Sequence, residues 1–297
     1  MDSQMSRTIA IVGNCQSFGV ASTLARIFSS DKIIPLSEAL TREDLQDCDV
    51  LIVDVGLSKS KDIISTFLSI GRSKEIIRIN SIVFAGFHPD LCYVTSRSSG
   101  KLTDYHYNSA IGSWAYANKL SPYDAQGLFC EEVFQCLGYF ESYERSVVAL
   151  KGLFCASDID FDAFFLPIKR TGVFMYSSNH PKLEALKHLS CLIAERIGVK
   201  NPFLNDFADI VDGLAADVWP VYPEIAAEHG LPGGSYTWRI RDKSVVGLKD
   251  YLEAVFDDYR LQGIRPDDLQ CSYFHTPPSG GHDEVLRRFA GLERRAE

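Results

Sequence analysis

Short apolar runs alternate with stretches of helical periodicity along the first third of the chain. Strand-like apolar runs occupy residues 7–13, 49–56 and 79–91, with a weaker run at 32–36. Between the first two, residues 17–29 place apolar side chains at helical spacing. Strands that are separated by helices pack as a parallel sheet with helices on its faces. The pattern therefore predicts an α/β sheet core over residues 7–120.

Helical segments dominate after residue 120. Amphipathic helices are predicted within 121–154, 182–197 and 247–264, and one strand is predicted at 172–180. Residues 221–240 indicate a helix, a glycine-rich turn and a short extended piece. Because no internal repeat or clear linker is present, we expect residues 1–297 to form a single domain. In it, a helix-rich part over 121–264 packs on the sheet core, and 277–297 form a peripheral tail.

The composition is that of a folded protein without a basic surface. Of the 297 residues, 46% are hydrophobic and 23% are charged, which is enough to bury a core. The net charge of −9 argues against a general binder of nucleic acid or of anionic membranes. No apolar run approaches the roughly 20 residues that cross a bilayer, and the N-terminal residues do not resemble a signal peptide. We expect a soluble, cytoplasmic protein, and the oligomeric state stays open.

The turn GNCQ, residues 13–16, follows the first predicted strand and opens the first predicted helix. Ligands of open parallel sheets bind beyond the carboxyl ends of the strands. A helix N-terminus there favours an anion, which can be a thiolate of Cys15, a bound phosphate or a developing oxyanion. Gly13 permits a sharp turn, while Asn14 and Gln16 offer amide donors. Cys15 is thus a candidate nucleophile, although free cysteines more often fill cores.

A nucleotide-binding turn is the rival interpretation of the same segment. Residues 13–18 lack the further glycines of G-x-G-x-x-G and the lysine of a Walker loop, so a pyrophosphate could not be held in the usual way. Metal binding is not indicated either. The eight cysteines contain no C-x-x-C pair, and the histidines form no H-E-x-x-H pattern. We expect reduced thiols and no required metal.

Two histidines each follow a predicted strand and precede a proline. They are His88, in FAGFHPD, and His180, in YSSNHPKLEAL. A nucleophilic thiol needs a base within hydrogen-bond reach, and both histidines would lie at the same sheet edge as Cys15. Pro181 suits the first position of a helix, which would leave the His180 ring free to point into a cleft. A structural role is the plain alternative for either ring.

Four elements in this order resemble the WcbI-type polysaccharide-biosynthesis acetyltransferases. They are GNCQ after the first strand, FAGFHPD, NHP opening a helix, and VYPEIAAEHGLPGGSY, and the similarity covers most of residues 7–260. The arrangement also looks like a distant relative of the SGNH hydrolases and acetyltransferases. Cys15 then takes the place of their serine, and Ser177 that of the aspartate three residues before the base. Asn179, Asp90 or another residue would have to orient His180 instead.

The resemblance implies binding of coenzyme A and transfer of an acetyl group to a sugar hydroxyl. Cys15 could form an acyl-enzyme with His180 as the base, or His180 or His88 could activate the sugar directly while Cys15 only shapes the pocket. A cysteine-dependent esterase or thioesterase of SGNH-like type would use the same residues. A non-catalytic module that binds coenzyme A or another anion is the third alternative.

Coenzyme A carries phosphates, so an acidic protein that binds it needs a local basic group. LPIKR offers Lys169 and Arg170 shortly before the His180 strand. YTWRIRDK offers basic residues interleaved with aromatic ones, namely Tyr236, Arg239, Arg241 and Lys243. Ordinary surface charge explains each of them equally well when it is taken alone. The expected partners are a small acyl donor and a saccharide acceptor.

Overall fold

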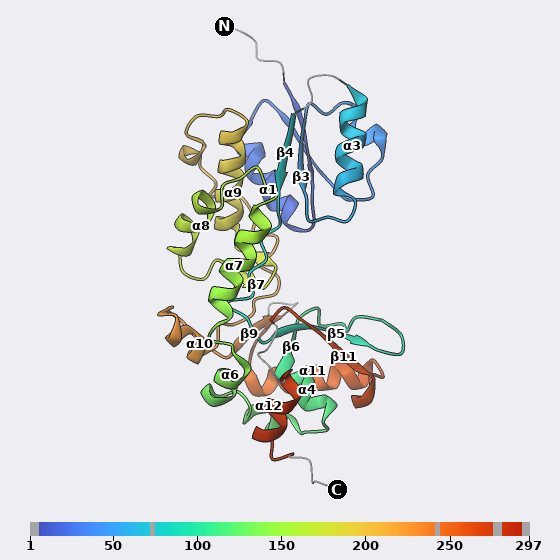
Figure 1. Cartoon of the computed structure of the whole chain (residues 1–297), viewed down its shortest axis with the longest axis vertical. Coiled ribbons are helices and arrows are strands. Elements are labelled where there is room, and N and C mark those ends of the chain that lie inside the picture. Colours follow the sequence, from blue (N-terminus) through green and yellow to red (C-terminus); the bar gives the residue numbers. More distant parts are fainter. Residues whose placement is uncertain (1–5, 72–74, 241–243, 276–280, 293–297) are drawn as a thin grey trace. The chain divides into compact units, whose positions relative to one another are not determined.

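The computed structural model describes residues 6–71, 75–240, 244–275 and 281–292 (Figure 1). Contacts within the chain group these residues into two compact units. Unit 1 comprises Met1–Val83 and Val148–Ala215, and unit 2 comprises Phe84–Val147 and Ala216–Glu297. Each is described by itself below, and the single-domain interpretation stays a prediction. Arg241 and Lys243 lie outside the described residues.

Unit 1 is built on a four-stranded parallel sheet with the strand order β2-β1-β3-β4. The strands are β1 (Thr8–Val12), β2 (Lys32–Leu36), β3 (Val50–Asp54) and β4 (Glu75–Ile79). All five residues of β3 are buried, as expected for an inner parallel strand with both faces covered. The predicted parallel sheet with flanking helices is therefore confirmed.

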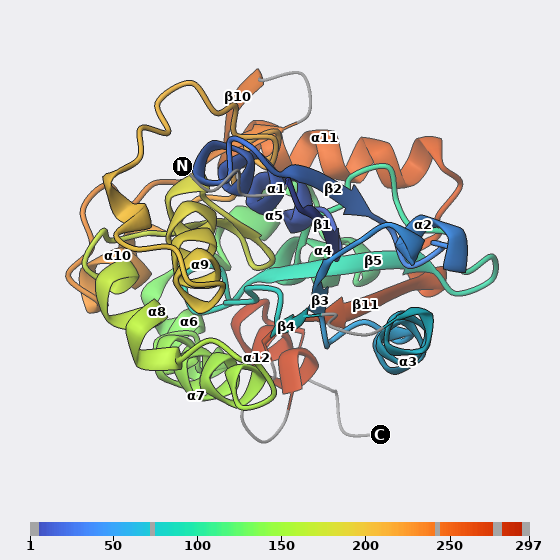
Figure 2. The same cartoon turned by 90° about the horizontal axis from the view of Figure 1, so that it is seen from above.

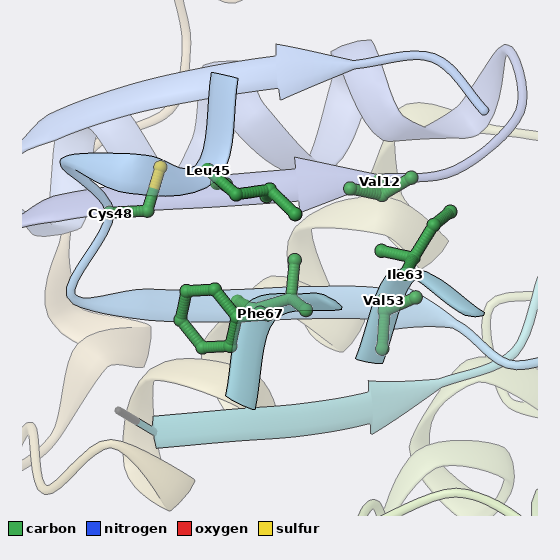
Figure 3. Packing of buried hydrophobic residues seen from close by; sticks show 8 residues of the cluster. Val12, Leu45, Cys48, Val53, Ile63 and Phe67 are labelled. Atoms are coloured by element: carbon green, nitrogen blue, oxygen red, sulfur yellow. The ribbon is translucent and has the colours of Figure 1, made fainter. Parts of the chain in front are cut away.

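Helices cover the sheet of unit 1 on both faces (Figure 1). Helices α2 (Arg42–Gln46) and α3 (Ser60–Ile70) lie on one face and α1 (Gln16–Ile27) on the other. Helix α9 (Leu183–Arg196) packs on α1, and both α8 (Phe161–Lys169) and the 3-10 turn at Pro202–Leu204 pack on α9. Figure 3 shows Val12 and Val53 of the strands facing Leu45 of α2 and Ile63 and Phe67 of α3. Cys48 is buried in the same cluster, so this thiol serves as a small apolar side chain.

The segment before α9 differs from the expectation. Instead of one strand over 172–180, a short hairpin pairs β7 (Met175–Ser177) with β8 (His180–Pro181). Pro181 therefore belongs to a strand, and α9 begins only at Leu183, whose backbone N–H donates to Asp212 Oδ2 at 2.9 Å. The helix itself, predicted over 182–197, is confirmed.

The apolar run at 79–91 is not a strand. β4 ends at Ile79, and the next strand, β5, begins at Leu91. Between them the backbone turns, with the N–H of His88 bonded to the carbonyl of Ala85 at 2.9 Å. Ile82, Phe84 and Phe87 are nonetheless almost fully buried. The apolar character of this run thus reflects burial and not strand pairing.

Unit 2 contains two antiparallel sheets. β5 (Leu91–Ser96) lies between β11 (Leu269–Tyr273) and β6 (Asn108–Ser109), and Figure 2 shows β5 and β11 side by side. A separate hairpin pairs β9 (Thr237–Ile240) with β10 (Ser244–Gly247). The helices are α4 (Ala110–Ala117), α5 (Pro122–Gln126), α6 (Glu131–Leu137), α10 (Pro223–Glu228), α11 (Leu248–Leu261) and α12 (Gly281–Phe289), with a 3-10 turn at Pro266–Asp268.

Of the predicted peripheral tail, residues 281–289 form a helix that packs against the rest of unit 2. Helix α12 packs against α4 and α6 of unit 2, and its Leu286 and His282 are buried. An amphipathic face explains this, because its apolar side chains recur at helical spacing in a stretch that is otherwise charged. One further helix, α7 (Ser142–Phe154), crosses the boundary of the two units. Within the described ranges, no helix is long and apolar enough to cross a membrane.

Candidate functional site

Cys15 occupies the position between a strand and a helix that its sequence context predicts. β1 ends at Val12, and Cys15 is the N-cap residue of α1. The turn is held by Asn14, whose side-chain Oδ1 accepts a bond from the N–H of Gln16 at 2.9 Å. The carbonyl of Asn14 accepts bonds from the N–H and the hydroxyl of Ser17 at 3.0 and 2.7 Å. The Cys15 side chain itself is exposed.

The electrostatic environment keeps Cys15 protonated. The protein around the thiol removes part of its hydration and raises its pKa above 9.0, which outweighs the lowering effect of the N–H groups of Cys15 and Gln16. The start of helix α1 therefore does not lower the pKa of this thiol below its ordinary value. A thiol of this kind needs a base to become a nucleophile.

Gln16 joins the Cys15 turn to two distant segments. Its side chain is buried and exchanges two bonds with Ile82, in which Nε2 donates to the Ile82 carbonyl and Oε1 accepts from the Ile82 N–H, each at 2.9 Å. Nε2 also donates to the carbonyl of Asn179 at 3.0 Å. Both N–H groups of this amide are thus used within the protein. Gln16 therefore links these segments by hydrogen bonds and does not present its amide to a ligand. We call these hydrogen bonds of Gln16 with Ile82 and Asn179 the Gln16 tie.

The same tie brings the His180 segment to the Cys15 turn. Asn179, whose carbonyl Gln16 holds, directly precedes His180 in the β7–β8 hairpin. His180 is half-buried. Ser177, at the position of the SGNH aspartate, is fully buried and donates its hydroxyl to Asn179 Oδ1 at 3.3 Å. The structure thus places Cys15, Gln16, Asn179 and His180 in one region of unit 1.

A pocket with about 270 Å³ of water-accessible space opens beside Cys15. Its wall comes from α1, α9 and the loop that follows η1 (Pro202–Leu204), and consists of Cys15, Phe18, Gly19, Ser22, Leu183, Leu186, Val211, Asp212, Gly213 and Leu214. The wall is mainly apolar, and Asp212 is already bonded to the N–H groups of Leu183 and Leu214. It suits an uncharged acyl or thioester group.

Sequence reasoning missed most of this wall. Phe18 lies three residues after Cys15 and remains 65% exposed, so an apolar residue on an outer helix face was the available signal. Gly19 had a signal as well, because a glycine inside a helical pattern often marks close packing. A Cβ at this position would stand 2.4 Å from Leu186 Cδ1, where α1 and α9 approach closely. Val211 and Asp212 come from a distant loop, and no local pattern marks them.

His88 and Asp90 lie in unit 2 and have a different environment. The His88 side chain is 1% exposed, and its ring packs edge-on against Phe87. The Asp90 carboxylate is fully buried and accepts bonds from Tyr139, Tyr222 and the N–H of Ile111 at 3.0, 2.6 and 2.9 Å. Burial raises the pKa of Asp90 to about 6 despite these donors. These contacts give Asp90 a structural role at the start of α4.

The predicted basic groups are divided between the two units. Lys169 and Arg170 lie at the end of α8 in unit 1, where Lys169 Nζ stands 6.0 Å from the centre of the Phe165 ring. Arg239 and Tyr236 belong to unit 2, and the Tyr236 hydroxyl donates to Glu224 Oε2 at 2.8 Å. Among the described residues no cluster of three potential metal ligands occurs. That no metal is required stays a prediction.

Comparisons with known proteins identify the family. A family model described as "Polysaccharide biosynthesis enzyme WcbI" matches residues 8–202. A comparison with curated proteins gave no significant match. Among solved structures, one that is described as "Structural insights into WcbI, a novel polysaccharide biosynthesis enzyme" superposes with a TM-score of 0.69 at 14% sequence identity. The superposition covers 97% of this chain and 96% of the chain of that structure. The chain therefore belongs to the WcbI family of polysaccharide biosynthesis enzymes.

Proposed function

We propose that the chain is an acyltransferase that moves acetyl from acetyl-coenzyme A to a sugar hydroxyl. The observation that carries the proposal is the exposed Cys15 thiol, which lines an apolar pocket at the start of α1. The similar solved structure is described as a native protein without a disulfide bond between COA and a cysteine, which supports a coenzyme A thiol close to a protein thiol. The family description supports a saccharide acceptor.

The first half-reaction forms an acyl-enzyme. His180 takes the proton of the Cys15 thiol, the sulfur attacks the thioester carbonyl, and the bond between carbonyl carbon and donor sulfur breaks. The departing thiolate takes the proton back from His180 and leaves as free coenzyme A. The N–H groups of Gln16 and Ser17 already donate to Asn14, so the Cys15 N–H is the donor at this turn that would stabilise the oxyanion.

The second half-reaction transfers the acetyl group to the sugar. His180 takes the proton of the sugar hydroxyl, whose oxygen attacks the acetyl carbon, and the Cys15 sulfur leaves and recovers that proton. Acetyl-cysteine is itself a thioester, so little driving force is lost at the intermediate. Direct attack of the sugar on acetyl-coenzyme A, with His180 as the base and Cys15 as part of the pocket wall, is the alternative route.

The cytoplasm, where acyl-coenzyme A donors are formed, is the expected location of the protein.

The deciding assay follows free thiol release from acetyl-coenzyme A, with and without the methyl glycosides of glucose, mannose and galactose. An acyltransferase releases thiol in proportion to the acetylated sugar that forms. Thiol release that is the same without any saccharide would instead make the chain a thioesterase. If no thiol is released and no acetyl group becomes attached to Cys15, the chain is a binding module and the proposal is wrong.

A further inference from the structure

The pocket beside Cys15 extends along helix α1. The residues of α1 and its N-cap that line the pocket are Cys15, Phe18, Gly19 and Ser22, which recur at helical spacing on one face. Cys15 is the first of them and Ser22 is the last. Because an α-helix rises 1.5 Å per residue, this wall runs for about 10 Å from the thiol. An acetyl group on Cys15 would fill only the beginning of the pocket.

The wall combines buried and exposed apolar side chains. Leu183 and Leu186 of α9 and Leu214 of the loop after η1 are almost fully buried. Phe18 and Val211 line the same pocket but remain 65% and 86% exposed. Exposed apolar side chains that border an apolar pocket are typical of a ligand-binding groove, because a bound ligand covers them. The pocket therefore offers a ligand apolar surface both in its interior and where it meets solvent.

The polar side chains of this wall are already bonded to the backbone. The Ser22 hydroxyl donates to the Phe18 carbonyl at 2.9 Å. Asp212 accepts the N–H groups of Leu183 and Leu214, one with each carboxylate oxygen, at 2.9 and 3.1 Å. A sugar, or the amide-bearing arm of coenzyme A, would lose water here and would need new hydrogen-bond partners, whereas a hydrocarbon chain needs none. The chemistry of the wall therefore favours a hydrocarbon chain.

We propose that this pocket binds the hydrocarbon chain of the acyl donor, so that the preferred donors are acyl-coenzyme A thioesters longer than acetyl. An extended chain advances about 1.3 Å per carbon, since C–C bonds measure about 1.5 Å, and the length of the wall thus matches roughly six to eight carbons. The chain of an acyl group on Cys15 lies along α1 and stays in place while coenzyme A leaves. The choice of an acyl donor rests on the proposed function, whereas the preference for a hydrocarbon rests on the pocket itself.

The first test uses thiol reagents and needs no coenzyme A. Methyl, pentyl and 2-acetamidoethyl methanethiosulfonate each transfer their organic thio group to a cysteine thiolate, which forms a disulfide and releases methanesulfinate. The pentyl and acetamidoethyl groups are equally long, but the second carries an amide like that of the coenzyme A arm. Peptide mass spectrometry measures the rates of modification of Cys15 and of Cys155, another exposed thiol of unit 1. The ratio of the two rates removes differences in the intrinsic reactivity of the reagents.

The pentyl reagent should raise this ratio at least about tenfold above that of the methyl reagent, because each buried methylene contributes a factor of about four. The acetamidoethyl reagent should stay within about threefold of the methyl reagent, since its amide finds no free side-chain partner in the wall. A ratio that does not rise with the pentyl group overturns the proposal. A higher ratio for acetamidoethyl than for pentyl would assign the pocket to the coenzyme A arm, and the proposal would be equally wrong.

Ser22→Leu shortens the pocket from its far end. The Ser22 side chain is exposed and its hydroxyl bonds within α1, so the variant should fold and react normally with the methyl reagent. Its pentyl ratio should fall about threefold or more, because the added methyl groups occupy space that the chain would fill. Ser65→Leu, at an exposed serine of α3, is the matched control. The same pentyl preference in both variants would place the chain outside this pocket and overturn the proposal.

The second test uses acetyl-, butyryl- and hexanoyl-coenzyme A as donors, with the methyl glycosides as acceptors. The kcat/KM for thiol release should be at least about tenfold higher for hexanoyl than for acetyl, and Ser22→Leu should remove this preference while it keeps acetyl transfer. Equal values for the three donors would overturn the proposal although transfer occurs. A pentyl preference at Cys15 without thiol release from any donor would instead refute the proposed function and, with it, the choice of an acyl donor. The two failures can therefore be told apart.

Discussion

The two His-Pro elements look alike in sequence but lie in different surroundings. His180 sits in a short hairpin of unit 1, is half-buried, and follows the residue that Gln16 ties to the Cys15 turn. His88 sits in an irregular segment of unit 2, is 1% exposed, and lies two residues before the buried carboxyl of Asp90. The degree of burial and the neighbouring residues distinguish His180, a candidate base, from His88, a structural histidine. The local His-Pro motif is the same in both and does not distinguish them.

The same contrast holds for the two units as wholes. In unit 1, the polar groups at the carboxyl ends of the strands hold a turn that leaves a thiol at the surface beside a pocket. In unit 2, the central carboxyl is enclosed and bonded to Tyr139, Tyr222 and α4, where it stabilises the fold. Changes in unit 1 should therefore alter turnover, and changes around Asp90 should alter stability.

The largest effect is expected for Cys15→Ala. Removal of the nucleophile should lower the turnover number at least about a hundredfold and change the affinity for coenzyme A only a few-fold, because a nucleophile acts mainly on the transition state. Steady-state kinetics and equilibrium binding measure the two quantities. Cys155→Ala is the matched control, since Cys155 is another exposed thiol of unit 1 and should be neutral. A Cys15→Ala variant with near-normal transfer would remove the covalent route.

The histidine pair should then separate activity from stability. His180→Ala should lower kcat/KM about tenfold to a hundredfold and abolish the acidic limb of the pH–rate profile, which reports protonation of the general base. His88→Ala should keep that limb and lower the free energy of unfolding by roughly 1–3 kcal/mol, because the His88 side chain is buried. Profiles of kcat/KM between about pH 5 and 9 for both variants show which histidine is the base. The opposite pattern would make His88 the base.

A smaller loss is expected from Gln16→Glu, which keeps the shape of the side chain. The new oxygen would face the carbonyls of Ile82 and Asn179, so the tie between the Cys15 turn and the His180 segment should loosen. We expect turnover to fall about tenfold and the free energy of unfolding to fall by about 1–3 kcal/mol. Gln126→Glu, which changes a single amide bond to a helix carbonyl in unit 2, is the control. If both variants keep full activity, Gln16 does not position the site.

The smallest effect on activity is expected for Asp90, whose signature is the pH dependence of stability. Its pKa in the folded chain, about 6, lies above the ordinary 3.8, so folding favours the protonated form. That stabilisation is complete below pH 3.8 and is lost as the pH rises through about 6. At 1.36 kcal/mol for each pKa unit, the free energy of unfolding should fall by on the order of 3 kcal/mol over this range.

Denaturant unfolding at several pH values measures this loss. The side chain of the Asp90→Asn variant carries no charge at any pH. The stability of this variant should therefore lack the part of the pH dependence that comes from titration of Asp90. Acetyl transfer by folded Asp90→Asn protein should stay near normal. An unchanged pH dependence of stability would show that Asp90 is ionised throughout, and a large loss of transfer would place it in the active site.

Most of the sheet of unit 1 was predictable because its strands are short runs rich in apolar residues, of which the inner strands β1 and β3 are almost fully buried. β1, β2 and β3 all appear where the hydrophobic pattern places them. The run at 79–91 was misread because a buried irregular segment is as apolar as a strand. The sheet of unit 2 was missed since β11 is largely exposed and pairs with β5 across a large separation in sequence.

The candidate site was predictable only in part. A cysteine between a strand and a helix is a local signal, and the structure confirms that position of Cys15. The protonation state of the thiol was not predictable, because it depends on how much of its hydration the folded chain removes. The wall residues Leu186 and Val211 were missed because they reach the pocket through tertiary packing.

The most direct test of acyl transfer through Cys15 is intact-protein and peptide mass spectrometry after rapid mixing with acetyl-coenzyme A in the absence of a saccharide. The account predicts one acetyl group on the peptide that contains Cys15, none on the peptide that contains Cys155, and none on Cys15→Ala protein. Addition of an accepted glycoside should then clear the label as acetylated sugar forms. Acetylated sugar that forms while Cys15 never carries the label, with His180 still required, would contradict the covalent route and leave direct transfer in its place.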